Sequence, residues 1–276
     1  ITRNTGGTLD LDAISIANTD NNNTNGILGG WATVNHSSWA QTVNSGAADT
    51  AITALGIYTT NGYANPNANV DVTLSSAPPN FGGNVNSLRF NTAAGAKLTL
   101  SDVNGVISGG ILVTPAVTSD FTMFDGSGSI TAGSTNASTD LIIHNWSGHK
   151  VTFDVPVDEN GTGATSLTIT GDSASTVVLA KTNTYSGQTT INGGTLQIGT
   201  GGTEGSTGNG QGTIYNNGTL VFNANRSFTH TGVIIGNGNI IMNTGDITLG
   251  GGNNFHGDVL VNGGTLTLTN GGGLGT

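Results

Sequence analysis

Short runs in which polar and apolar residues alternate recur along most of the chain. In Thr195–Ile198 (Thr-Leu-Gln-Ile) the two aliphatic side chains fall on one face and the two polar ones on the other. This period of two is typical of a half-buried β-strand. The preceding Thr189–Ile191 is also β-favouring, and the intervening Asn192–Gly194 (Asn-Gly-Gly) tolerates a positive φ. The pattern predicts a strand, a tight turn and a second strand.

This strand-turn-strand unit occurs twice in the second half of the chain. The stretch Asn183–Gly199 has a second copy at Asn253–Leu268, and both contain the run Gly-Gly-Thr-Leu. The copies share the turn glycines, the asparagine before them and the aliphatic positions, whereas polar positions change, as from Ser186 to His256. The shared positions are those that a stacking coil needs. We therefore interpret the repeat as a building unit.

Looser copies of the unit extend the pattern to most of the chain at intervals of roughly 20–30 residues. One unit with two or three short strands cannot bury its apolar side chains alone, whereas stacked coils bury them in one continuous column. We therefore predict an all-β protein, a single-stranded parallel β-helix (β-solenoid). The side chains expected to point inward are Leu196, Ile198, Leu220, Phe222, Leu266 and Leu268, and those expected to point outward are Gln197, Val221 and Thr267.

The repeats are clearest in residues 141–276 and less regular in residues 1–140. The segment from Thr59 to Asn80 contains Pro66, Pro78 and Pro79 among Asn and Ala residues. Proline disfavours a central strand, so we expect a loop excursion near residues 59–80. Strands of the same composition stand on both sides of this loop. We therefore expect one continuous β-helix over residues 1–276.

Composition and charge narrow the class of protein. Charged residues make up 8% of the 276, the formal net charge is −10, and the six Lys and Arg residues are spread singly along the chain. A nucleic-acid partner is not expected, because phosphate binding needs clustered basic residues. Membrane insertion by this segment is not expected either, since no apolar run approaches the ~18 residues of a spanning helix. The absence of cysteine is compatible with export but also with many other settings.

The second half of the chain resembles a known family of repeats. The residues that carry the likeness are Leu167–Thr170, Val177–Leu179, Asn183–Gly187 and Thr189–Ile198. They are similar to the autotransporter-associated β-strand repeat in the passenger region of bacterial autotransporter proteins. This resemblance implies a right-handed parallel β-helix, a location on the bacterial cell surface or in the secreted fraction, and an adhesive or stalk-like role.

Because β-helices also host carbohydrate-cleaving enzymes, we searched the sequence for paired carboxylates. The closest pair is Asp10 and Asp12, two residues apart on one strand face, and we interpret both as outward-facing, solvated acids. Arg89 and Lys97 have Asp102 nearby, but no second acid accompanies it. We therefore assign no catalytic residue and expect no enzymatic activity.

Metal and cofactor signals are weak. Asn21–Gly26 (Asn-Asn-Asn-Thr-Asn-Gly) partly matches a Ca²⁺-binding loop, but its first ligand would be Asn, and the twelfth position is Ala32 instead of Glu. An ordinary polar loop is the preferred interpretation. His144 and His149 flank Trp146 without further ligands at metal-binding spacing. We expect no cofactor and no metal; the alternative is Ca²⁺ at the asparagine loop.

Three tryptophans, Trp31, Trp39 and Trp146, are candidates for a sugar-stacking platform, although such residues more often fill the core. The sequence as a whole favours an extracellular, non-enzymatic structural or adhesive β-helix, such as an adhesin stalk or fibre subunit, that can stack end to end into a filament. The expected partners are copies of itself, adjoining solenoid coils, host surfaces or extracellular glycans. The alternatives are a β-helical carbohydrate-active enzyme and a glycan-binding module.

Overall fold

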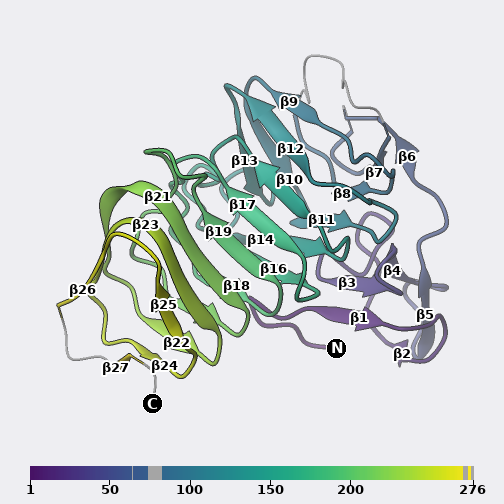
Figure 1. Cartoon of the computed structure of the whole chain (residues 1–276). Helices are drawn as coiled ribbons and strands as arrows, with labels where there is room; N and C mark the ends of the chain where they lie inside the picture. The colour runs from purple at the N-terminus through teal and green to yellow at the C-terminus, as the bar shows by residue number, and fades with distance from the viewer. Residues whose placement is uncertain (64, 74–82, 270–272, 275–276) are drawn as a thin grey trace.

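The computed structural model describes residues 1–63, 65–73, 83–269 and 273–274. Within these ranges the chain is all β, with no helix, and its parallel sheets stack as a β-solenoid of about 11 turns. Figure 1 shows the coils following one another from the teal strands to the yellow ones, with the purple N-terminal strands alongside. The predicted fold class, an all-β parallel solenoid, is confirmed.

The longest sheet has eleven strands, and each coil of the solenoid contributes one. Its register is parallel, as in the pairing of Ile169 with Ile191 between β16 and β18. In chain order its strands are β6 (Thr59–Thr60), β7 (Asn69–Val72), β8 (Ser87–Phe90), β11 (Gly110–Val113), β14 (Thr139–Asn145), β16 (Thr165–Gly171), β18 (Thr189–Ile191), β20 (Ile214–Asn216), β22 (Ile234–Gly236), β24 (Asn254–Phe255) and β27 (Gly273–Leu274).

A second parallel sheet runs beside the first, and short strands complete the coils. Its strands are β9 (Leu98–Leu100), β12 (Phe121–Gly126), β15 (Lys150–Phe153), β17 (Thr176–Leu179), β19 (Thr195–Ile198), β21 (Thr219–His230), β23 (Asn239–Leu249) and β25 (Val259–Val261). β26 (Thr265–Leu268) pairs with the second half of β23, and β10 (Val103–Val106) pairs with β13 (Ser129–Ala132).

The core is a column of inward side chains that lie in register from coil to coil. Leu196 on β19 pairs with Leu220 on β21, which pairs with Ile240 on β23, and all three are fully buried. Aromatic rings continue the column, with the centroids of Phe124 and Phe153 5.0 Å apart. Burial of this kind stabilises the fold by about 25 cal/mol per Å² of apolar surface.

The predicted inward positions are borne out. Leu196, Ile198, Leu220 and Phe222 are buried, and Leu266 and Leu268 pack half-buried against the same core. Val221 lies on the opposite face of β21 and is also buried, since Gln197 and Ile241 flank it in register on the neighbouring strands.

The first asparagine of the repeat has a role that the sequence did not reveal. The Oδ1 atom of Asn183 accepts a hydrogen bond from the N–H of Val157 (2.8 Å), in the adjacent coil. In the second copy, the Oδ1 atom of Asn253 accepts one from the N–H of Ile234 (2.8 Å). Both asparagines are buried, so each satisfies a backbone donor that water does not reach.

The N-terminal strands depart from the continuous β-helix that we expected from residue 1. They form a separate five-stranded sheet, in the order β1-β3-β4-β5-β2, in which only β1 and β3 pair in parallel. We call it the lateral sheet, and its strands are β1 (Leu9–Leu11), β2 (Asn18–Thr19), β3 (Ala32–Val34), β4 (Ser38–Thr42) and β5 (Thr50–Ala54). Figure 1 shows it beside β11, β14 and β16.

Apolar outward residues on the solenoid explain why the lateral sheet docks there. Ile111 and Val113 on β11 point into the solenoid core, whereas Leu112 between them packs outward against Ile27 and Trp39. A strand with apolar residues on both faces needs cover on both.

The expected excursion near residues 59–80 lies partly outside the described residues, which leave out 74–82. The described part of this segment contains β6 and β7, and both belong to the eleven-stranded sheet.

Candidate functional site

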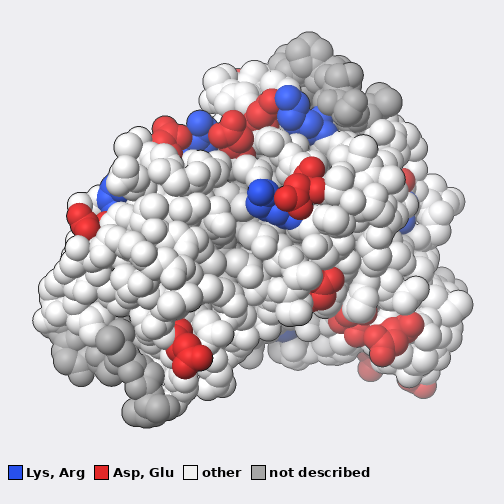
Figure 2. Space-filling model, viewed as in Figure 1, with Lys and Arg blue, Asp and Glu red and all other residues white. Residues whose placement is uncertain are grey.

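Charged side chains on the solenoid are mostly engaged in local pairs. Lys97 Nζ lies 2.6 Å from Asp125 Oδ2, and Lys181 Nζ lies between Asp154 (3.2 Å) and Glu204 (3.1 Å). Figure 2 shows such groups along the upper edge of the molecule, where blue and red atoms alternate. The two carboxylates beside Lys181 raise the pKa of its ammonium group. These contacts are those of a solvated surface, on which exposed pairs contribute little stability.

Arg89 is paired with a different acid from the one near it in sequence. Its Nε and Nη2 atoms make a bidentate contact with Asp71 (2.8 and 2.9 Å), and its guanidinium lies 3.6 Å from the centroid of the Tyr58 ring. Arg89 also donates from Nη1 to the carbonyl of Ser37 (3.2 Å), which belongs to the lateral sheet segment. The structure therefore places Arg89 at the docking interface, where its acid partner is Asp71.

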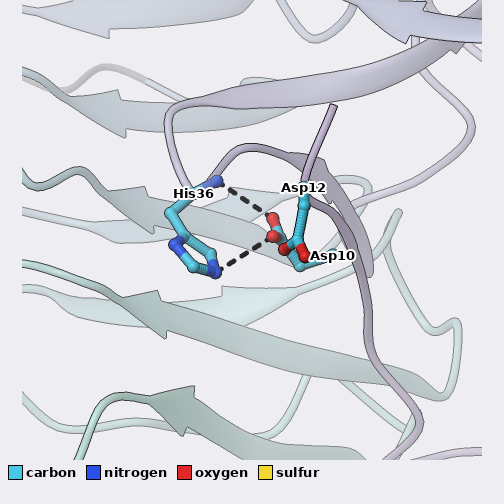
Figure 3. A group of neighbouring side chains, drawn as sticks. All are labelled: Asp10, Asp12 and His36. Carbon is cyan, nitrogen blue, oxygen red and sulfur yellow. Dashed lines mark hydrogen bonds and ion pairs between the residues drawn. The ribbon is translucent and has the colours of Figure 1, made fainter. Parts of the chain in front are cut away.

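The structure brings Asp10 and Asp12 together with a histidine; Asp12 is exposed as expected, whereas the side chain of Asp10 is only 13% exposed and is not the solvated acid that we expected. Asp10, Asp12 and His36 place one ligand atom each within 4.8 Å of one another, the one such group of three among the residues described. Figure 3 shows the imidazole of His36 facing the carboxylate of Asp10, with Asp12 beside them. Asp10 lies on β1, Asp12 directly follows it, and His36 comes from the turn between β3 and β4.

The two oxygens of Asp10 have different surroundings. Oδ1 accepts hydrogen bonds from Thr33 Oγ1 (2.6 Å) and from the N–H of His36 (3.0 Å). Oδ2 is buried and lies 3.0 Å from His36 Nε2, without the alignment of a hydrogen bond. Parallel pairing of β1 with β3 sets this arrangement, because it puts Asp10 opposite Thr33. One oxygen is therefore held by the protein and the other faces the imidazole.

The turn that carries His36 has an unusual backbone. Asn35 and His36 both have positive φ values (51° and 54°), and the N–H of Ser37 donates to the carbonyl of Val34 (3.2 Å). This is a type I′ turn, whose second central position most often holds glycine. Histidine is disfavoured in this conformation, by roughly 1–3 kcal/mol. The turn directs the imidazole onto Asp10.

Trp146 connects this group to the solenoid. Its ring stacks on the imidazole of His36, with centroids 4.0 Å apart and planes inclined by 24°. Trp39 is fully buried at the docking interface, and Trp31 is half-buried. The three tryptophans therefore occupy different environments, and they do not form the exposed coplanar platform considered for sugars.

The two histidines that flank Trp146 also separate in space. The Nε2 atom of His144 contacts the carbonyl of Gly30 (2.9 Å), whereas His149 faces Asp120 on the surface (3.6 Å). Burial lowers the pKa of His144 to about 4, so its ring is neutral at pH 7 and Nε2 carries the donated proton. His144 thus acts as an internal contact between β14 and the lateral sheet.

The asparagine loop uses its side chains to hold the chain together. Asn23 Oδ1 accepts the N–H of Thr42 (2.8 Å), and Asn25 Nδ2 donates to Asn86 Oδ1 (3.1 Å) on the solenoid. Ala32, at the position where a Ca²⁺ loop has Glu, is a buried residue of β3. The side-chain oxygen of Asn23 thus accepts a backbone hydrogen bond, as in an ordinary polar loop.

Comparisons with protein-family models, with curated proteins and with solved structures found no match. No helix in the described part of the chain is long and apolar enough to cross a membrane.

His36 is the member of the group that the sequence search missed. The one local signal was a histidine at the centre of the Val34–Ser37 hairpin turn, where glycine is usual.

Proposed function

We propose that this chain is a structural or adhesive segment of an extracellular β-solenoid, on the bacterial cell surface or secreted, with a mechanical instead of a catalytic role. The observation that carries the proposal is the unbroken column of inward side chains, in register through successive coils. Each coil buries its apolar residues only by stacking on its neighbours. This construction is suited to a stiff rod that carries or joins other groups.

The arrangement of polar residues supports the same role. The two basic residues considered for catalysis each pair with a single acid, Lys97 with Asp125 and Arg89 with Asp71, and these pairs lie on different strands. A carbohydrate-cleaving site would need carboxylates on either side of one bound sugar. The likeness of the repeats to autotransporter passenger domains supports a location outside the cell. Extracellular glycans or host surfaces are then the proposed external partners.

The proposal includes stacking of further coils on the C-terminal side. Val261 on β25 continues the inward row of Met242 but is 47% exposed, whereas Met242 is fully buried. An adjoining coil, from this chain or from a second copy, would cover Val261 and pair with the strand edge.

Two measurements test this function. Electron microscopy and size-exclusion chromatography should show rods or end-to-end assemblies, and Val261→Asp should shift them to dispersed single particles. Ile57→Asp is the matched control, because Ile57 is 85% exposed and lies on no described strand. Dispersed wild-type monomers at all concentrations would remove the stacking proposal. Turnover of a polysaccharide by the purified chain would overturn the mechanical role.

A further inference from the structure

We propose that Asp10, Asp12 and His36 form a binding site for a divalent transition-metal ion of the zinc class. This inference is independent of the mechanical role, because it depends only on one group of side chains in the lateral sheet. Three features carry it: the buried oxygen of Asp10 that faces His36 Nε2 without a hydrogen bond, the contacts that hold the other oxygen and the imidazole, and the exposed carboxylate of Asp12 beside them.

The first feature is the space between Asp10 Oδ2 and His36 Nε2. These atoms are 3.0 Å apart, and the oxygen is buried without a hydrogen bond from any described residue. A carboxylate oxygen and an imidazole lone pair repel each other unless a cation lies between them, either a proton or a metal ion. Two ligand atoms about 2.0–2.2 Å from one tetrahedral Zn²⁺ ion are separated by about 3.4 Å, so the two atoms would move apart by about 0.4 Å to hold the ion.

The second feature is the support around the two inner ligands. Thr33 and the N–H of His36 hold Asp10 Oδ1, which leaves Oδ2 as the oxygen available for an ion. Trp146 stacks on the His36 ring and fixes its plane. Contacts from residues around the ligands orient the ligand atoms in many metal sites of proteins. The Asp10 side chain is 13% exposed, so a bound ion would be only partly desolvated.

The third ligand and the donor types indicate the metal. Asp12 is exposed and reaches the group from the solvent side, so it can close on an ion that the other two residues hold. One imidazole nitrogen with two carboxylates suits Zn²⁺ and its neighbours, with a fourth position left to water. Ca²⁺ and Mg²⁺ prefer sites made entirely of oxygen, with six or more ligands.

Binding would join two parts of the lateral sheet that lie 26 residues apart in sequence. An ion shared by Asp10 and His36 links β1 to the turn between β3 and β4. Because His36 also stacks on Trp146 of the solenoid, the ion would strengthen docking of the whole lateral sheet.

The test is isothermal titration of the full chain with ZnCl₂ at pH 7 in a buffer that does not chelate metals. We expect one saturable site per chain, an affinity loss of at least tenfold for His36→Gln and Asp10→Asn, and a smaller loss for Asp12→Asn. His149→Gln is the matched control, since His149 also faces a carboxylate, that of Asp120 at 3.6 Å, but has no second acid ligand in its group. This variant should bind like the wild type.

A second measurement detects binding in the wild-type chain, so it stands even if a ligand variant fails to fold. Cu²⁺ added to the wild-type chain should quench the fluorescence of Trp146 at one equivalent, and Zn²⁺ should compete with the quenching. The quenched fraction should disappear in Trp146→Phe. Three results would overturn the proposal. The first is that neither ion binds saturably, in which case the group is only a hydrogen-bonded Asp–His pair. The others are that His149→Gln abolishes binding, or that Ca²⁺ binds as tightly as Zn²⁺.

Discussion

The contact between Gly30 and Gly110 allows a sharp test of how the lateral sheet docks. Gly110 lies on β11, and a Cβ added to it would come 2.5 Å from Gly30 Cα and 2.8 Å from Trp39 Cη2. Ordinary contacts of a Cβ are 3.4–4 Å, so Gly110→Ala must push the lateral sheet outward by about 1 Å. Gly110 has no positive φ, so the alanine itself is not strained and the effect is purely steric.

The cost has two parts. Overpacking of a close interface costs about 1–3 kcal/mol. The same displacement weakens the buried hydrogen bond between His144 and the carbonyl of Gly30, and an unsatisfied buried polar group costs about 1–3 kcal/mol. Because the hydrogen bond is weakened and not lost, we count about 1 kcal/mol for it and expect a total near 2–4 kcal/mol, which destabilises docking of the lateral sheet and not the solenoid. Opening of the lateral sheet should then become roughly 30- to 700-fold more frequent, since 1.4 kcal/mol is a factor of ten.

Hydrogen–deuterium exchange measures this directly. Amides of β3 and β4 should exchange faster in Gly110→Ala, while those of β19 and β21 should keep their protection, and the emission of buried Trp39 should shift to the red. Gly56→Ala is the matched control, because an added Cβ there meets nothing within 4 Å and φ is not positive. Unchanged exchange and emission in Gly110→Ala would refute the close packing of the two glycines. Equal acceleration in the solenoid strands would refute independent docking.

Two further predictions concern pH and the repeat asparagine. The free energy of unfolding should be constant above about pH 6.5 and fall between pH 6.5 and 4. Burial lowers the pKa of His144 in the folded chain to about 4, so in this range the unfolded chain binds the proton more readily. The contribution of His144 to the loss at pH 5 is about 2 kcal/mol, and buried His230, whose pKa is also lowered to about 4, adds to it. Urea unfolding at pH 7 and pH 5 measures the combined loss, and a pH-independent midpoint would contradict both assignments. Asn183→Ala should lower stability by about 1–3 kcal/mol, because it strips the Val157 N–H and the Ser206 carbonyl of their buried partner. Thermal unfolding should show no comparable loss for the control Asn225→Ala, because Asn225 is exposed. Equal losses in the two variants would argue against the stabilising hydrogen bonds that Asn183 makes to neighbouring coils.

The solenoid could be predicted from sequence because the constraint is local and repeated. Every coil needs the same alternation, as in Leu196 and Ile198, and the same glycine turn, so each copy strengthens the evidence from the others. The bridging role of Asn183 could not be predicted in this way. Its partner is the N–H of Val157, and the stacking register decides which backbone group lies opposite.

The lateral sheet was missed because its strands have the same composition as solenoid strands. Leu9–Leu11 has the same alternation as a coil strand, but it pairs with Ala32–Val34 of the lateral sheet. The sequence signal for the lateral sheet lies in the solenoid strands that it covers. The uninterrupted apolar runs Ile111–Val113 and Leu141–Ile143 imply that β11 and β14 are covered on both faces. The site was not predicted, because Asp10 and Asp12 were recognised as the closest acid pair but interpreted as solvated surface acids. Asp10 and Asp12 are neighbours in sequence, whereas His36 joins them only through this pairing.

Polar contacts explain why the lateral sheet docks in one position on its apolar support. Asp140 on β14 is buried, and its carboxylate is satisfied from both sides, by the guanidinium of Arg3 and the N–H of Gly6 and by the hydroxyl of Thr168. Displacing the N-terminal segment would leave this charge buried without its Arg3 partner, which costs more than losing apolar contact. Leu112 therefore supplies apolar attraction that does not fix where the lateral sheet sits on the solenoid. The Asp140 contacts fix that position. A sheet held in this way can carry a preorganised metal site, because its position on the solenoid is defined before any ion binds.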